Sequence, residues 1–397
     1  MATSLVNSLY SRSKMNTIHK INIYQILLFA LIVRLAVFII MPNIEFPDFA
    51  TYTNAGLQLF STGQINEHSV MPLHPIFVNL LQNSFMVKLA NILLSTASVW
   101  LVYQLVLVIF KEKLYATLAA LGSSVYPHFI FYSITGLTET LYVALVLLAF
   151  LLLYKKQFIW AFIVITISIL HRPILDLLAP ILIFIFSFYV HKLGYKNSFL
   201  NILKYTLIYM ILMSSWWLHQ YNKYDQFVRL NLGDGVVWYS GNNPLNKSGG
   251  GVWGSIKGDD VNLTNFSYIK DPILKNKAFK ESAFEYIKNN PQRFVELAGL
   301  KFVRFWRLWP YAPKYETPFY IVVSLLSYGV ALLLSIVFVF KYLRENFNSI
   351  LPIIVLFSYF TVVHMVLISS IRYRLPLEPF LVIFSAFVLG KLLKKGD

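Results

Sequence analysis

Two carboxylic acids in the sequence stand where an apolar segment begins or has just ended. Asp48 lies in EFPDFATYTNAG, a few residues after a long apolar run, and Glu139 opens the apolar run ETLYVALVLLAF. Two carboxylates at the same membrane surface could hold an acceptor hydroxyl and its proton. Each also has a structural alternative, because Asp is a preferred N-cap residue and a glutamate at a helix N-terminus is stabilised by the helix dipole. The local sequence leaves these alternatives open.

Three arginines are candidates to bind an anionic group. Arg172 lies in ILHRPILD, and Arg372 and Arg374 lie in SSIRYRLPLEP. A guanidinium is planar and always charged, so it suits a phosphate group. The structural alternatives are an ion pair between Arg172 and Asp176, four residues later, and snorkelling of Arg372 and Arg374 toward lipid headgroups.

Three further polar residues occupy unusual places. His74 stands between two prolines in VMPLHPIF, and Tyr52 lies in the stretch that Asp48 opens. We include both among the candidate substrate-binding residues, although a lone histidine is more often structural. Arg34 lies deep in the first apolar run, where a charge is a functional hypothesis by default. Neighbouring helices could supply it with a buried partner, and we therefore interpret Arg34 as structural.

Several kinds of chemistry have no support in the sequence. Cysteine is absent, which excludes disulfides, thiolate metal sites and cysteine nucleophiles. There is no phosphate-binding glycine loop, no HExxH and no cluster of histidines. We therefore predict no cofactor and no metal site. Carboxylates could hold a divalent ion, but no motif supports one.

The composition indicates a membrane protein that crosses the bilayer many times. Of 397 residues, 57% are hydrophobic and 13% are charged, whereas a soluble domain carries about 25% charged residues. The formal net charge of +16 does not indicate nucleic acid, because many basic residues lie in short turns between apolar runs. Hydropathy predicts an all-α fold with about ten spans. These are residues 21–41, 84–110, 114–134, 138–154, 157–171, 174–190, 198–219, 318–340, 349–370 and 377–392.

Basic residues in alternate turns predict the topology. In a model with ten spans, all of these clusters fall on one side, and the positive-inside rule makes that side and both termini cytoplasmic. The clusters are Arg12, Lys14 and Lys20; Lys111 and Lys113; Lys155 and Lys156; Lys192 and Lys196; Lys341 and Arg344; and Lys391, Lys394 and Lys395. Asp48, Glu139, Arg172, Arg372 and Arg374 then share the opposite, outer side.

The chain divides into three regions. Residues 1–219 form an N-terminal membrane module with a first outer loop at 42–83, residues 220–317 form a long outer segment, and residues 318–397 form the C-terminal membrane helices. In the first outer loop, a helix opened by Asp48 and ended by Gly63 would rest Phe49, Ala55, Leu59 and Phe60 on the membrane. In the outer segment, one helix would run from Asp271-Pro272 to KNNP and an amphipathic helix would follow over 291–309.

These stretches, in this order, resemble the GT-C integral-membrane glycosyltransferases, and in particular glycosyltransferase family 39. That family includes protein O-mannosyltransferases and enzymes similar to the lipid A aminoarabinose transferase. The matching stretches are PDFATYTNAGLQLFSTGQ, MPLHPIF, YPHFIFYSITGLTETLYVALVLLAFLLL, LHRP, WWLHQYNKYDQFVRLNLGDGVVWYSGNNP, IKNNPQRFVELAGLKFVRFW and IRYRLPLEPFLVI. They cover most of the chain. The chain departs from the family in its short length, in a single acid at Asp48 where O-mannosyltransferases have an Asp-Glu pair, and in lacking a lysine at the LHP patch.

The resemblance implies an inverting transfer of a sugar from a polyprenyl-phosphate donor to a hydroxyl of a glycan, lipid or protein acceptor. Asp48 would be the general base and Glu139 would hold the acceptor or tune Asp48. His74, Arg172, Arg372 and Arg374 would neutralise the departing phosphate, and Tyr52 would contact substrate. The protein would lie in the bilayer of a bacterial inner membrane with its active face outside. The alternatives are a polysaccharide polymerase or ligase, and a glycolipid transporter or flippase.

Overall fold

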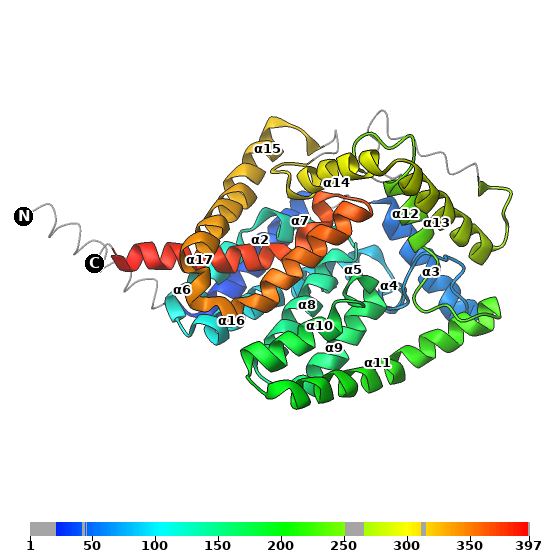
Figure 1. The fold of residues 1–397 in the computed structure, drawn as a ribbon. Coiled ribbons are helices and arrows are strands. Elements are labelled where there is room, and N and C mark those ends of the chain that lie inside the picture. The colour runs from blue at the N-terminus through cyan, green and yellow to red at the C-terminus, as the bar shows by residue number, and fades with distance from the viewer. Residues whose placement is uncertain (1–20, 42–43, 45, 251–265, 311–314, 396–397) are drawn as a thin grey trace, which may run out of the picture.

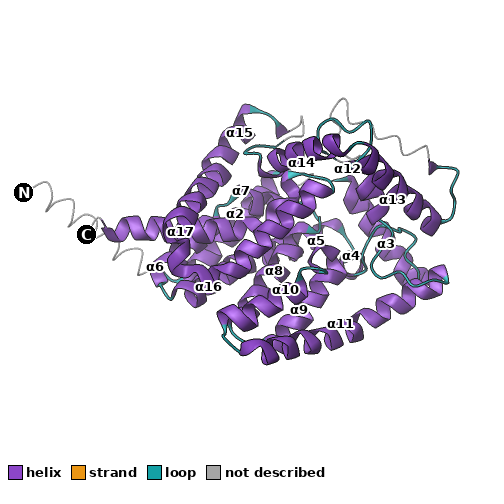
Figure 2. Cartoon of the chain, viewed as in Figure 1, coloured by secondary structure: helices purple, strands orange, loops and turns teal. Residues whose placement is uncertain are grey.

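The computed structural model describes residues 21–41, 44, 46–250, 266–310 and 315–395. Within these ranges every regular element is a helix and there is no strand (Figures 1 and 2). The longer helices are α2 (Ile23–Ile40), α3 (Pro47–Thr62), α4 (Leu73–Leu80), α5 (Ser84–Phe110), α6 (Lys113–Ser124), α8 (Glu139–Tyr154), α9 (Phe158–His171), α11 (Gly194–Tyr224), α12 (Asp234–Gly241), α13 (Pro272–Asn289), α14 (Pro291–Trp306), α16 (Val330–Val366) and α17 (Glu378–Lys395). The shorter elements are α7 (Pro127–Ser133), η1 (Pro173–Leu175), α10 (Ala179–Ile185), η2 (Phe186–Val190), α15 (Pro318–Ser324), η5 (Leu325–Gly329) and η6 (Ile371–Leu377).

The helices include candidate membrane spans, but the predicted count of ten is not confirmed. Among the described residues, five helical stretches are long and apolar enough to cross a bilayer, and three shorter apolar helices accompany them. The predicted span 114–134 is divided into α6 and α7, because Pro127 starts a new helix and disfavours helical backbone just before it. The predicted spans 318–340 and 349–370 lie in one helical stretch, Pro318–Val366, which turns back on itself near its middle (Figure 1). Phe338 and Phe357, on the two legs, both lie against Phe384 of α17.

Helix α17 belongs to the most buried of the five long apolar stretches among the described residues. It is buried over most of its length and packs against α6 and α16, and α5 packs against α6 and α8 (Figure 1). Helix α2 lies at the rim, with most of its apolar surface exposed. That distribution suits a bundle whose outer helices face lipid and whose inner helices face one another.

The predicted basic turns meet at one end of the bundle. Lys394 pairs with Glu112 at 2.5 Å, and His191 hydrogen-bonds the carbonyl of Leu153 at 2.7 Å. The Tyr154 hydroxyl donates to the carbonyl of Ser349 at that end. Arg12, Lys14 and Lys20, which the topology prediction also uses, lie outside the described residues.

The first outer loop contains the predicted helix, but the face of this helix that is exposed differs from the prediction. Helix α3 ends at Gly63, whose φ of 72° closes the helix in the left-handed conformation. Ala55 is buried in the core, whereas Phe60 is 55% exposed, so the predicted membrane-facing set is wrong. The reason is that α3 packs against α4 through Gly56, where a Cβ would lie 2.5 Å from the carbonyl oxygen of Pro75.

The described residues of the outer segment include helices α12, α13 and α14, which lie together over one end of the molecule (Figure 1). Asp271 caps α13 by accepting a hydrogen bond from the amide of Leu274, and Pro272 occupies the first turn. Helix α14 begins at Pro291 and has apolar residues concentrated along one face. Both predicted helices of this segment are therefore confirmed.

Arg34 has the structural environment that we predicted for it. Its guanidinium is completely buried, donates to Ser95 Oγ at 2.8 Å, and also donates to the carbonyl oxygens of Ala30, Ser123 and Ser124. Ser123 and Ser124 end α6, where carbonyl oxygens have no partner within the helix. Arg34 therefore closes the end of α6 at the place where the predicted span is interrupted.

We predict that Arg34→Met destabilises the folded protein by about 3 kcal/mol, because it leaves buried carbonyl oxygens and Ser95 without their donor. The measurement is thermal or denaturant unfolding in detergent micelles. Arg344→Met, at an exposed position of α16, is the control and should leave the unfolding midpoint unchanged. An Arg34→Met protein with wild-type stability would contradict the structural assignment.

Candidate functional site

Four charged side chains from distant parts of the sequence meet at the other end of the bundle from the basic turns. They are Asp48 in α3, Glu139 at the start of α8, Arg172 just after α9, and Arg372 in η6. Arg372 Nη1 lies 2.6 Å from Asp48 Oδ2, and Arg372 Nε donates to Glu139 Oε1. Arg172 Nη1 lies 2.8 Å from that same oxygen of Glu139. We call these four residues the charged cluster.

The members of the charged cluster differ in exposure. The side chain of Glu139 has 0% exposed surface, whereas those of Arg172 and Arg372 are 23% and 22% exposed. Asp48 is 38% exposed. The cluster is therefore closed on the Glu139 side and open to its surroundings on the Asp48 side. Glu139 Oε2 is buried and has no hydrogen-bond partner among the described residues.

Asp48 does not cap its helix. The N-cap residue of α3 is Phe46, which makes no side-chain cap, and Asp48 lies within the first turn. Its carboxylate turns instead to Arg372, so the N-cap alternative for Asp48 is wrong. Glu139 does begin α8, so its position at the helix N-terminus agrees with dipole stabilisation as well as with its ion pairs.

Two histidines fix the turn that precedes Glu139. His74 Nε2 lies 3.2 Å from the carbonyl oxygen of Gly136, and His171 Nε2 lies 2.8 Å from that of Thr138. Gly136 has a φ of 71°, and a Cβ there would lie 2.8 Å from the ring of Phe49. Only glycine accommodates this close approach without strain. Helices α3, α4 and α9 thus hold the turn from three sides.

The same two histidines present unused acceptors. A carbonyl oxygen can only accept, so Nε2 of each ring carries the hydrogen and Nδ1 of each neutral ring is an acceptor. Both Nδ1 atoms are buried and have no partner among the described residues. Burial, together with the neighbouring His171, lowers the pKa of His74 well below its ordinary value. His74 therefore stays neutral at physiological pH.

Aromatic rings surround the charged cluster. The Tyr52 ring meets that of His74 edge-on at 4.6 Å, and the two histidine rings lie 5.1 Å apart. The Arg172 guanidinium lies 5.7 Å from the ring centre of Tyr142 and 5.9 Å from that of Tyr373. Such contacts stabilise a cation while leaving its N–H groups available.

Arg374 is not part of the charged cluster. Its side chain is completely buried, pairs with Glu378 at 2.9 Å, and donates to the carbonyl oxygens of Phe305 and Arg307. The guanidinium also lies 3.6 Å above the ring centre of Tyr328. The snorkelling alternative is therefore wrong for Arg374, which lies in a separate ion pair below the surface.

The predicted pair of Arg172 with Asp176 is also wrong. Asp176 accepts from the hydroxyl of Tyr209 at 2.6 Å and pairs with Arg229 at 2.5 Å. The backbone at Arg172 is extended, and Pro173 begins a separate short helix. Asp176 therefore does not lie one helical turn from Arg172 on a shared face, and the spacing rule for helices does not apply.

The sequence analysis missed three residues that contact the site: His171, Tyr142 and Tyr373. His171 precedes Arg172 directly in the stretch HRP, and Tyr142 lies three residues after Glu139. Their closeness in sequence to a candidate charged residue could therefore have identified them as site residues. Tyr373 lies between the two arginines of IRYR and could have been identified in the same way.

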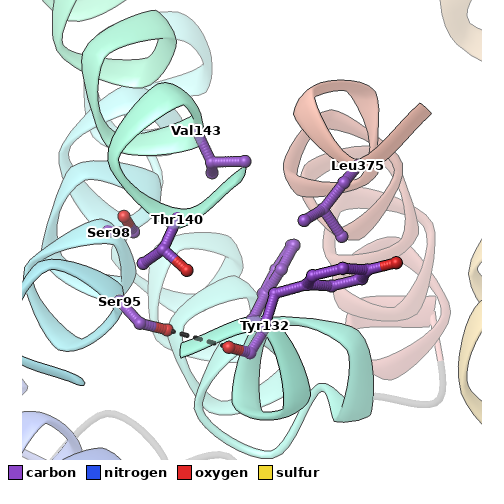
Figure 3. Close-up of a pocket in the computed structure, with 7 residues that line it drawn as sticks. Ser95, Ser98, Tyr132, Thr140, Val143 and Leu375 are labelled. Atoms are coloured by element: carbon purple, nitrogen blue, oxygen red, sulfur yellow. Dashed lines mark hydrogen bonds between the residues drawn. The ribbon is translucent and has the colours of Figure 1, made fainter. Parts of the chain in front are cut away.

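A small cavity lies deeper in the protein and is not the site. It is lined by Ser95, Ser98, Phe129, Tyr132, Thr140, Val143 and Leu375 (Figure 3). Its volume of about 10 Å³ corresponds to one water molecule and excludes a sugar. Ser95 Oγ donates to the Phe129 carbonyl and accepts from Arg34, so this cavity adjoins the buried arginine. Among the described residues, no group of three His, Cys, Asp or Glu side chains could hold a metal ion.

Comparison with solved structures identifies the architecture. An oligosaccharyltransferase, AglB, from Archaeoglobus fulgidus, solved with an inhibitory peptide and a dolichol-phosphate, superposes with a TM-score of 0.53 at 13% identity. The match covers 94% of this chain and 50% of that one. The apo form of the oligosaccharyltransferase from the same organism gives a TM-score of 0.51 at 12% identity, covering 95% and 51% of the two chains. The chain therefore shares the fold of these oligosaccharyltransferases over the part that is matched.

At this level of identity the likeness concerns the fold. The chain spans about half the length of these oligosaccharyltransferases. No protein-family model matches the sequence, and no curated protein matches it either. Membership of glycosyltransferase family 39, which the sequence motifs predict, is not confirmed by these comparisons and remains a prediction.

The charged cluster predicts unequal effects of removing its two acids. We expect Glu139→Gln to destabilise the protein by about 3–5 kcal/mol, because it leaves two guanidiniums facing each other without their buried counter-charge. Asp48→Asn should cost under about 1 kcal/mol, because Asp48 is partly exposed and Arg372 keeps Glu139. Unfolding midpoints of the two variants in the same detergent test this order. Equal midpoints would show that Glu139 does not anchor the cluster.

Proposed function

We propose that the protein is a membrane glycosyltransferase that transfers a sugar from a polyprenyl-phosphate donor to an acceptor hydroxyl at the end of the bundle that carries the charged cluster. The observation that supports this most is the meeting of Asp48, Glu139, Arg172 and Arg372, which the chain brings together from four elements. The shared fold with an oligosaccharyltransferase solved with a dolichol-phosphate and a peptide agrees with a lipid-phosphate donor.

Arg172 and Arg372 would bind the donor phosphate. Both are about one-quarter exposed and both point at one carboxylate oxygen, so their remaining N–H groups lie close together. A phosphate that accepts from both guanidiniums would receive charge-assisted hydrogen bonds where negative charge develops during transfer. Arg374, buried and paired with Glu378, would serve the structure and not the phosphate.

Asp48 would be the general base. In the structure its Oδ2 is occupied by the ion pair with Arg372, and a phosphate that draws Arg372 away would free that oxygen for an acceptor hydroxyl. Asp48 would then take the proton of the acceptor hydroxyl as the acceptor oxygen forms a bond to the anomeric carbon. The bond from that carbon to the phosphate oxygen breaks, and its electron pair stays on the phosphate beside the arginines. Attack opposite the leaving phosphate inverts the anomeric centre.

Three buried acceptor atoms beside the charged cluster would accept hydrogen bonds from the hydroxyl groups of the sugar. Nδ1 of His74, Nδ1 of His171 and Oε2 of Glu139 are buried acceptors without donors in the described structure. A hexose or pentose supplies several hydroxyl donors, and the partly exposed Tyr52 would supply an aromatic face on which a sugar packs. These contacts support a sugar more than an apolar ligand, because an apolar group would leave the acceptors unsatisfied.

The cellular setting follows from the same proposal. The basic turns lie at the end of the bundle away from the charged cluster, as in an inner-membrane protein with cytoplasmic turns and an outer active face. A bacterial inner membrane, about ten crossings of the bilayer, cytoplasmic termini and the three-region division at residues 219 and 317 belong to this proposal. Membership of glycosyltransferase family 39, and an acceptor that is a glycan, a lipid or a protein, are also part of the proposal.

We predict that Asp48→Asn lowers the transfer rate at least about 100-fold while the protein folds normally, because the general base is lost. The measurement is the release of free polyprenyl phosphate from the donor by purified protein, and the glycolipid and glycoprotein mass profile of complemented deletion cells. Glu67→Gln is the matched control, an exposed acid in the same outer loop, and it should retain full activity. Full activity of Asp48→Asn would reject Asp48 as the base.

We predict that His171→Phe weakens binding of the sugar-bearing donor by roughly tenfold and leaves binding of sugar-free polyprenyl phosphate unchanged, because only the sugar donates to Nδ1. The two dissociation constants are measured side by side on protein in nanodiscs. His191→Phe, which removes a similar histidine–carbonyl bond at the opposite end of the bundle, is the control. An equal loss for both lipids would mean that His171 only holds the turn before Glu139.

A further inference from the structure

The turn that delivers Arg372 to the charged cluster is bound by the outer segment. We call residues 366–371 the arginine turn. Lys301 Nζ in α14 donates to the carbonyl oxygen of Val366 at 3.1 Å, and Arg304 Nε in α14 donates to that of Ser369 at 3.0 Å. In the other direction, Ser369 Oγ donates to the carbonyl oxygen of Lys301 at 2.7 Å. Helix α14 thus contacts the arginine turn at its first residue and near its middle.

A second strip of outer segment, residues 241–250, binds the same turn. Asn242 Nδ2 donates to the carbonyl oxygen of Val366 at 3.0 Å, and the Ser369 amide donates to that of Gly249. The contact is very close, because a Cβ on Gly241 would lie 1.9 Å from the carbonyl oxygen of Leu367. We call α14 together with residues 241–250 the outer clamp.

Gly249 and the buried amine of Lys301 hold residues 241–250 against α14. Gly249 has a φ of 76°, and a Cβ there would lie 2.7 Å from Cγ of Lys301. Lys301 has no exposed surface and donates to Asn242 Oδ1 at 3.0 Å. Burial lowers the pKa of Lys301 to about 7. A buried amine is costly unless its hydrogens are satisfied, so its contacts with the turn and with Asn242 are strongly specified.

The chain is also anchored on the far side of Arg372. Arg374 donates to the carbonyl oxygens of Phe305 and Arg307, where α14 ends. Within the turn, the amide of Arg372 donates to Ser370 Oγ. Arg372 therefore extends toward Asp48 and Glu139 from a short segment whose two flanks are both fastened to α14.

We propose that the outer clamp positions Arg372 for the donor phosphate, with Lys301 and Gly249 as positioning residues. A shift of α14 or of residues 241–250 would move the backbone that carries Arg372, and a displacement of about 1 Å at a reacting group can cost up to about 100-fold. A movement of the outer segment would thereby change how well Arg372 binds the phosphate. An acceptor that moves the outer segment would have the same effect. This proposal rests on the proposed function of Arg372.

The test measures the affinity of the full-length protein in nanodiscs for undecaprenyl phosphate without a sugar. We expect Lys301→Met and Gly249→Ala each to weaken binding roughly tenfold. Gly299→Ala and Lys288→Met are the matched controls, because a Cβ at Gly299 meets no atom within 4 Å and Lys288 is exposed. Both controls should bind as the wild type does. Using two clamp variants keeps the test decisive if one of them does not fold.

A double-mutant cycle separates positioning from general damage. In the Arg372→Gln background, Lys301→Met and Gly249→Ala should weaken binding further by less than about twofold, because their effect acts through the missing arginine. If the clamp variants still lose about tenfold in affinity in the Arg372→Gln background, the positioning role is wrong. If the single variants bind as tightly as the wild type, it is also wrong. Neither result bears on the proposed phosphate site. If Arg372→Gln itself binds as tightly as the wild type, the proposed phosphate site is wrong and the positioning role falls with it.

Discussion

The buried carboxylate of Glu139 is the charge that the rest of this end of the protein must balance. It has no exposed surface, and removing such a charge from water costs several kcal/mol unless it is paired and hydrogen-bonded. Arg172 and Arg372 provide the pairing from two elements that lie far apart in the sequence. The requirement to neutralise one carboxylate therefore fixes how α8, α9 and η6 meet, and Arg372 brings in α3 through Asp48.

The sequence was sufficient to find the members of this cluster and the helices that lead to them. Charges are rare in a chain with 13% charged residues, so each acid or arginine at the end of an apolar run stands out. Local signals also located α3, which ends at Gly63, and α13, which Asp271 caps, because helix ends depend on neighbouring residues alone. Composition and hydropathy also indicated an all-helical chain, which the described residues are.

Which charged residues pair could not be predicted, because pairing depends on how the backbone runs in the segments that join the helices. Arg172 and Asp176 have helical spacing, yet the backbone is extended at Arg172 and each residue found a distant partner. Arg374 and Glu378 have the same spacing and do pair. The count of ten spans is not confirmed, because hydropathy measures apolar length and does not tell a helix that crosses the bilayer from a shorter apolar helix such as α10.

The charge balance of the cluster also bears on which acid yields during the proposed reaction. Two guanidiniums and two carboxylates sum to zero, so a bound phosphate would add negative charge to a neutral site and must displace a carboxylate from its arginine. Glu139 cannot yield, because it is sealed from solvent and would be left as an unpaired buried charge. Asp48 is more than one-third exposed, and Arg372 is its ion-pair partner among the described residues. In the proposed reaction an entering phosphate would therefore free Asp48 and leave Glu139 in place. One acid would become available as a base while the other continued to hold the arginines.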